Sequence, residues 1–125
     1  MLKDSNAAAT IAVKDLAVAK RFYESVLGLT PLPATEPGVA PFRTGATSIL
    51  VYQSQFAGTN RATAATWTVE DDLEGLVQAL KAKGVTFEHY DMPDTKLQGD
   101  VHIAGDMKVA WFKDPDGNIL ALVGR

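Results

Sequence analysis

The hydrophobic residues in the first half of the chain follow a strand period, then a helix period, then a strand period again. The apolar run at 7–13 predicts a β-strand, and Asp15 follows it at the position of a helix N-cap. Apolar residues then recur every three or four positions as far as Gly28, which predicts an amphipathic helix that ends at this glycine. Two β-prone runs at 40–44 and 47–53, separated by a glycine, predict a hairpin. The first half is therefore predicted to be a βαβββ module.

The second half repeats this order of elements. Residues 64–69 predict a strand that corresponds to the first one. Asp71, followed three residues later by Glu74, has the spacing of a capping box and predicts the start of a helix. Gly84 predicts its end, and residues 85–90 predict the next strand.

The last third of the chain predicts a loop and a hairpin. Residues 91–106 are mainly polar and predict a loop, whereas residues 108–113 and 119–123 are β-prone. The connection between the two strands, Asp114-Pro115-Asp116-Gly117-Asn118, suits a type I turn followed by a glycine. The chain is therefore predicted to end in a β-hairpin.

The two halves share a sequence phrase at a constant spacing. Val13-Lys14-Asp15 corresponds to Val69-Glu70-Asp71, an offset of 56 residues, and the two glycines that end the helices have the same offset. We therefore predict a tandem duplication with an α+β fold. Two βαβββ modules, at about residues 7–54 and 62–124, are expected to form one curved mixed sheet around a cavity, within a single domain spanning residues 1–125.

Composition and charge narrow the classes of partner. The chain has 125 residues, of which 46% are hydrophobic, and this suits one globular core. The net charge of −3 offers no basic surface for nucleic acid or an anionic membrane, so a small molecule or a protein is the expected partner. The absence of cysteine excludes disulfides and thiolate metal ligands and suits a reducing compartment, so a cytoplasmic location is expected.

Several motifs together resemble the vicinal oxygen chelate superfamily, which includes glyoxalase I, extradiol dioxygenases, and bleomycin and fosfomycin resistance proteins. The resemblance rests on Val13-Lys14-Asp15-Leu16, Phe22-Tyr23, Val26-Leu27-Gly28-Leu29 and the segment from Trp111 to Asn118. It extends over almost the whole chain and implies a fold rather than a reaction. Members of the superfamily commonly pair, so the resemblance also implies a homodimer.

Enzymes of that superfamily hold a divalent metal with His, Gln or Glu side chains. The positions that correspond to these ligands carry four aliphatic residues in this chain: Ala8, Leu50, Ala64 and Ala121. None of these side chains can bind a metal, and their sequence neighbours are no better. The resemblance therefore implies a protein without the family metal site, and we expect no metal and no other cofactor.

The final hairpin predicts a pocket residue. A five-residue loop at 114–118 would place Trp111 opposite Ala121, beside a lost ligand position, and strand alternation adds Val109 to the same face. The other residues predicted to line the cavity by alternation and by the resemblance are Ser48, Leu50, Tyr52, Thr66 and Thr68. A register change of one residue would instead turn Trp111 into a core residue on the helix side.

Two kinds of function remain open. An apolar cavity without metal ligands favours a protein that captures a small hydrophobic or aromatic compound, in drug or metabolite resistance for example. The alternative is a glyoxalase-like lyase or isomerase, or a dioxygenase-like enzyme. Such an enzyme would use a non-standard metal site at the two histidines of the chain, His89 and His102, or His102 as a general base.

Overall fold

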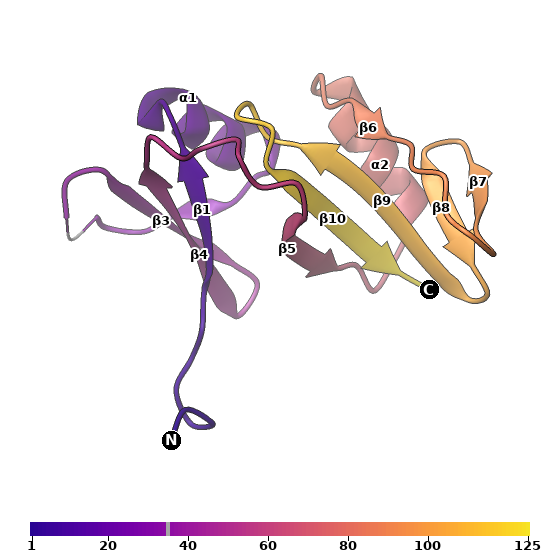
Figure 1. The fold of residues 1–125 in the computed structure, drawn as a ribbon, viewed down its shortest axis with the longest axis horizontal. Helices are drawn as coiled ribbons and strands as arrows, with labels where there is room; N and C mark the ends of the chain where they lie inside the picture. Colours follow the sequence, from indigo (N-terminus) through magenta and orange to yellow (C-terminus); the bar gives the residue numbers. More distant parts are fainter. Residues whose placement is uncertain (35) are drawn as a thin grey trace. The chain divides into compact units, whose positions relative to one another are not determined.

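The computed structural model describes residues 1–34 and 36–125. The chain has an α+β fold in which a βαβββ order of elements occurs twice, as predicted (Figure 1). The strands form two mixed sheets, of four and six strands, instead of the single sheet that we expected. Two compact units contain them, unit one at Met1–Thr59 and unit two at Asn60–Arg125. The single-domain assignment and the cavity shared by both modules stay predictions.

Unit one consists of a four-stranded sheet and a short helical segment. Its elements are β1 (Ala9–Val13), α1 (Leu16–Arg21), the π-helical turn η1 (Phe22–Val26), β2 (Thr30–Pro31), β3 (Val39–Thr44) and β4 (Thr47–Gln53). The strands lie in the order β1, β4, β3, β2, and β1 runs parallel to β4 while the other pairs are antiparallel. The predicted hairpin at 40–44 and 47–53 is confirmed as β3 and β4.

The helix of unit one begins at the predicted cap. The carboxylate of Asp15 accepts hydrogen bonds from the backbone N–H of Ala17 at 2.9 Å and of Val18 at 3.2 Å. Helix α1 packs against β3 and β4, and Tyr23, which follows it, is fully buried near Phe42 with 6.0 Å between ring centroids. One face of the sheet is therefore covered by the helical segment, as an amphipathic helix requires.

Unit two repeats this order and adds a hairpin. Its elements are β5 (Thr63–Thr68), α2 (Leu73–Ala82), β6 (Phe87–Glu88), β7 (Lys96–Gln98), β8 (Val101–Ala104), β9 (Met107–Lys113) and β10 (Ile119–Gly124). The strands lie in the order β5, β10, β9, β8, β7, and β6 pairs with β9 as well. Strand β5 runs parallel to β10, just as β1 runs parallel to β4 in unit one. The arrangement supports the internal repeat seen in the sequence.

Two local predictions for unit two are wrong. The N-cap of α2 is Asp72 and not Asp71: its carboxylate accepts a hydrogen bond from the N–H of Gly75 at 3.0 Å, with the backbone of Asp72 left-handed at φ 50°. With Asp72 as N-cap, Glu74 is the second and not the third residue of the helix, so it does not have the spacing of a capping box, and its carboxylate accepts a hydrogen bond from Lys108 of β9 at 2.6 Å. The predicted strand at 85–90 is also shorter, since only β6 pairs with β9.

The predicted loop at 91–106 contains two strands instead. Ala104 pairs with Met107, so β8 and β9 are joined by the two-residue turn Gly105-Asp106, and β7 adds to the outer edge of β8. His102 is consequently a strand residue with only 2% of its surface exposed. Pairing with β9 organises this segment in spite of its polar composition.

The sheet of unit two has two different faces. Ala110, Phe112, Leu120 and Leu122 are buried, and Gly124 of the same series meets Leu73 of α2, so this face is the helix side. Trp67 pairs with Leu122 and therefore lies on the helix side. The opposite side, which we call the open face, carries the alternate residues of β9 and β10. None of the helices in the described part of the chain is long and apolar enough to cross a membrane.

Candidate functional site

The open face of unit two brings several predicted site residues together. Trp111 pairs with Ala121 and Val109 pairs with Val123, which is the predicted register of the final hairpin. On β5, Thr66 pairs with Ala121 and therefore lies on the same face, as does Thr68, the partner of Val123. The alternative position of Trp111 on the helix side is excluded by this register.

The strand β5 differs from simple alternation at its start. Its register with β10 shifts between Ile119 and Leu120, so that Thr63 pairs with Ile119 and Ala64 is left as an extra residue. Thr63 is thus the β5 residue that lies next to Ile119 on the open face. Ala64, which the resemblance placed at a metal-ligand position, lies in an irregularity of the strand.

The predicted residues of unit one also share one face of their strand. Ile49 and Val51 of β4 are buried, whereas Ser48, Leu50 and Tyr52 alternate with them and are half-buried. Their common orientation follows from the strand period, as expected. That they line one pocket together with residues of unit two stays a prediction.

Trp111 belongs to a cluster of rings on the open face. Its ring lies edge to face with Tyr90, at 5.3 Å between centroids, and with His102, at 4.9 Å. Tyr90 and His102 are stacked at 6.2 Å with 27° between their planes. Such contacts hold the rings in fixed orientations, so that the exposed part of Trp111 is presented as a rigid apolar surface.

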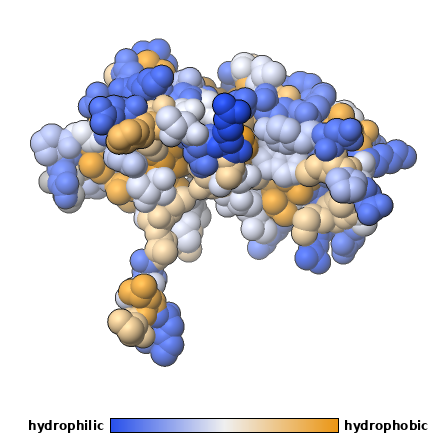
Figure 2. Space-filling view, in the orientation of Figure 1, coloured by the Kyte–Doolittle hydropathy of each residue, from blue (hydrophilic) through white to orange (hydrophobic). Residues whose placement is uncertain are grey.

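A pocket opens beside Trp111. Its volume is about 250 Å³, and it is lined by Arg61, Ala62, Thr63, Tyr90, Trp111 and Ile119. On the face shown in Figure 2, hydrophilic and hydrophobic residues are interspersed over both units. The pocket combines a flat aromatic wall with a hydroxyl group and a guanidinium group.

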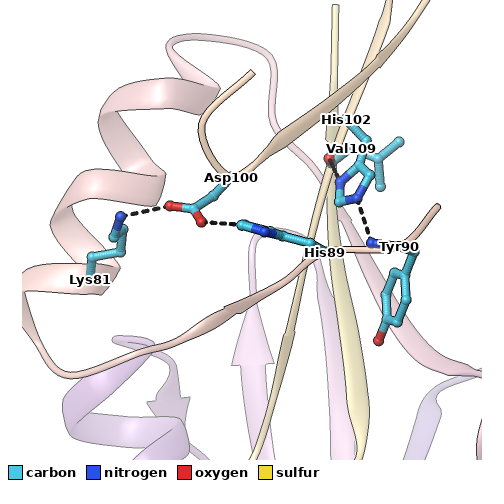
Figure 3. A network of polar contacts seen from close by, with 6 residues as sticks. All are labelled: Lys81, His89, Tyr90, Asp100, His102 and Val109. Carbon is cyan, nitrogen blue, oxygen red and sulfur yellow. Dashed lines mark hydrogen bonds and ion pairs between the residues drawn. The ribbon is translucent and has the colours of Figure 1, made fainter. Parts of the chain in front are cut away.

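The hydroxyl group of Tyr90 is buried and finds no hydrogen-bond partner in the described part of the protein. Figure 3 shows this hydroxyl directed away from His102, whose ring bonds the backbone of Tyr90 instead. A buried donor without a partner costs about 1–3 kcal/mol. A ligand that supplies an acceptor here would recover part of that cost.

His102 has no ring nitrogen left for catalysis. Its Nε2 accepts a hydrogen bond from the backbone N–H of Tyr90 at 2.9 Å, so the neutral ring carries its hydrogen on Nδ1, 3.3 Å from the carbonyl oxygen of Val109 (Figure 3). Both bonds tie the ring to the backbone of neighbouring segments, and the side chain is buried. The geometry therefore gives no support to His102 as a general base.

His89 belongs to a separate polar network. Its Nε2 lies 2.8 Å from one oxygen of Asp100, and the other oxygen accepts a hydrogen bond from Lys81 of α2 at 2.7 Å (Figure 3). Two hydrogen bonds lower the pKa of Asp100 below its ordinary value: the one from Lys81 has the larger effect and the one from His89 the smaller. His89 also lines a second pocket of about 250 Å³, on the other side of Tyr90, together with His102.

This network predicts a small loss of stability in acid. Asp100 has a lowered pKa in the folded state, so its contribution is complete above the ordinary value of 3.8 and is lost as the pH falls through the lowered pKa. We expect Asp100→Asn to lower the free energy of unfolding by less than about 1 kcal/mol at pH 7, with the difference disappearing in acid. Urea unfolding at both pH values measures it. The same loss in Asp106→Asn, an exposed carboxylate, would contradict a specific role for Asp100.

The residues do not fit the metal that the fold family implies. The four positions for the family ligands are aliphatic, and among residues 1–34 and 36–125 no group of three or more His, Cys, Asp or Glu residues lies close enough to hold an ion. A divalent metal needs several such donors at fixed distances. His89 and His102 are neighbours, 6.4 Å apart between ring centroids, but Nε2 of each already has a partner.

Of the six residues that line the pocket, only Trp111 was predicted from the sequence, and the two polar ones that matter most, Tyr90 and Arg61, were missed. Tyr90 was assigned only to a strand, and Arg61 to the connection between the modules. The two-residue turn Gly105-Asp106 was the available signal for β8, because such a turn between apolar runs is typical of a hairpin. The positions of Tyr90 and Arg61 beside Trp111 depend on tertiary packing and leave no trace in local patterns.

Comparison with known proteins identifies related folds. The model of the Glyoxalase/Bleomycin resistance protein/Dioxygenase superfamily matches residues 7–122. No curated protein sequence matches the chain significantly.

Three similar solved structures share less than a fifth of their residues with this chain. An integron cassette protein from the mobile metagenome of the Halifax Harbour sewage outfall has a TM-score of 0.72 at 17% identity, with 98% of this chain and 99% of that chain covered. The fosfomycin resistance protein FosX from Listeria monocytogenes has a TM-score of 0.73 at 14% identity, with 98% and 93% covered. Lactoylglutathione lyase from Agrobacterium tumefaciens has a TM-score of 0.67 at 17% identity, with 98% and 95% covered. At these identities the likeness extends to the fold alone.

Proposed function

The chain belongs to the Glyoxalase/Bleomycin resistance protein/Dioxygenase superfamily, and we propose that within it this protein captures a small hydrophobic or aromatic compound without a metal. The observation that carries the proposal is the pocket on the open face of unit two, where Trp111 and Tyr90 form an aromatic wall. Flat compounds gain binding free energy by stacking on such a wall and by burying apolar surface away from water. Thr63 at the pocket, with Thr66 and Thr68 farther along β5, would supply hydroxyl groups that orient the polar atoms of the ligand.

The lack of a metal is part of the proposal. The aliphatic residues at the family ligand positions and the absence of a donor cluster in the described part of the chain support it. A compound held by stacking and hydrogen bonds needs no metal, so the function does not depend on the missing ligands. Drug or metabolite resistance by capture is a role of this kind. A homodimer is expected from the family resemblance, and a cytoplasmic location from the absence of cysteine.

A metal-free lyase or isomerase is the second candidate. It is favoured by the contact between His89 and Asp100, because a carboxylate at 2.8 Å from one ring nitrogen orients an imidazole for general-base work at the other. His89 lines a pocket. His102 lines the same pocket, but both of its ring nitrogens already form hydrogen bonds with the backbone. If the protein converts a bound compound and His89→Ala abolishes this conversion, the result would favour the enzyme. If a compound binds but is not converted, the result would favour capture.

Native mass spectrometry of protein purified without chelator tests the proposal. We expect a dimer without stoichiometric divalent metal, because the donor set that holds such an ion is missing among residues 1–34 and 36–125. We also expect the melting temperature to be unchanged by EDTA. A control sample incubated with excess Zn²⁺ and then desalted shows whether adventitious metal is retained. One metal per subunit, lost in His89→Ala, would contradict the metal-free function.

A further inference from the structure

The pocket beside Trp111 contains an uncompensated positive charge. Arg61 lines the pocket and takes part in none of the ion pairs of the described residues. The neighbouring charge of Lys113 is paired, because its Nζ lies 3.3 Å from a carboxylate oxygen of Glu88, and these residues flank Trp111 on β9 and β6. The pocket therefore favours a ligand that carries a negative charge.

The hydroxyl group of Tyr90 adds a second polar requirement. It is buried, it has no hydrogen-bond partner in the described part of the chain, and its residue lines the same pocket as Arg61. A phenolic hydroxyl donates one hydrogen bond, and an oxygen atom of a ligand would satisfy it once a tilt of the Tyr90 ring brings the hydroxyl to the pocket surface. A carboxylate offers such oxygens and the negative charge at once.

We propose that this pocket takes a single-ring aromatic carboxylate, a specification that rests on the proposed capture function. The ring stacks on Trp111, the carboxylate faces Arg61, and a ligand oxygen accepts the hydrogen bond of the Tyr90 hydroxyl. The volume of about 250 Å³ suits a ligand of this size, because pockets for drug-sized compounds span roughly 300–1,000 Å³. Stacking supplies affinity for the ring, and Arg61 supplies preference for the acid.

Calorimetric titration with benzoate and with its neutral analogue benzamide tests the inference. We expect benzoate to bind about tenfold more tightly than benzamide at low salt, where exposed charges are least screened. Arg61→Gln is expected to weaken the binding of benzoate about tenfold and so to remove its preference over benzamide. Lys96→Gln is the matched control, because it removes the same charge from an exposed position outside the pocket. Tyr90→Phe is expected to weaken both probes without lowering the melting temperature, since it removes a donor that has no partner among the residues that the structure describes.

The outcomes separate this inference from the proposed function. Equal affinity for both probes, or a preference that survives Arg61→Gln, would overturn the carboxylate specificity and leave capture of aromatic compounds intact. A melting temperature that falls in Tyr90→Phe would overturn the role of its hydroxyl. If neither probe binds, and neither changes the emission of Trp111 in a Trp67→Phe background, the assignment of this pocket to single-ring aromatic ligands is wrong, whereas the capture function is tested separately by the mass spectrometry above.

Discussion

Replacing Trp111 with alanine is expected to weaken the binding of benzoate and benzamide about 100-fold. The indole provides the flat wall of the pocket and orients Tyr90 through a ring contact of 5.3 Å. Loss of the stacked surface together with its buried area costs about 2–3 kcal/mol, which is close to two decades in the dissociation constant. Calorimetric titration of the folded variant measures the loss.

Two further variants separate loss of the wall from damage to the fold. Trp111→Phe keeps an aromatic face at the same position and is expected to retain most of the affinity. Trp67→Phe alters the other tryptophan, which lies on the helix side of the same sheet, and is expected to leave both probes unaffected. Circular dichroism spectra identify variants that have lost structure. An affinity in Trp111→Ala equal to that of the unmodified protein would disprove the role of the indole in binding.

Much of the fold follows from local patterns in the sequence. The final hairpin was predicted in its correct register because the turn at 114–118 fixes which residues pair, and pairing fixes the face on which Trp111 lies. The faces of β4 followed in the same way from alternation, with Ile49 and Val51 buried. Where the turn type and the alternation of apolar residues predict the same strand register, the local sequence is enough to assign a side chain to one face of the sheet.

The failures have physical causes of a different kind. His102 was expected in a loop, but β8 gains hydrogen bonds by pairing with β9, and this tertiary gain outweighs the polar composition of its surroundings. Ala64 was expected on the open face, but the register shift beside Ile119 displaces it. Arg61 and Tyr90 come from separate segments and meet only in the folded unit. The chemistry of the candidate pocket was therefore not accessible from the sequence, although the aromatic residue at its centre was.

The turn that positions Trp111 should also be important for stability. Asp114 is 5% exposed, and one of its carboxylate oxygens accepts hydrogen bonds from the backbone N–H groups of Asp116 and Asn118, both at 2.9 Å. Its other oxygen accepts a hydrogen bond from the side-chain amide of Asn118 at 2.8 Å. Gly117, with φ 87°, completes the turn by donating its N–H to the carbonyl of Asp114. The carboxylate therefore holds the whole connection between β9 and β10.

Asp114→Ala is expected to lower the free energy of unfolding by about 3 kcal/mol and the melting temperature by about 10 °C. The substitution removes all three bonds to the carboxylate and leaves the buried amide of Asn118 without this acceptor. Asp114→Asn is expected to cost less, because its oxygen still accepts from the backbone while its NH₂ group faces that of Asn118. Urea unfolding measures both variants.

Asp106→Ala is the matched control, because Asp106 occupies the turn between β8 and β9 but has a side chain that is 84% exposed, with a single long ion pair of 3.7 Å. It is expected to change stability by less than about 0.5 kcal/mol. Since the Asp114 turn sets the register that holds Trp111 on the open face, the folded fraction of Asp114→Ala should also bind benzoate more weakly. Losses of equal size in the two aspartate variants would mean that the carboxylate of Asp114 has no special role in the hairpin.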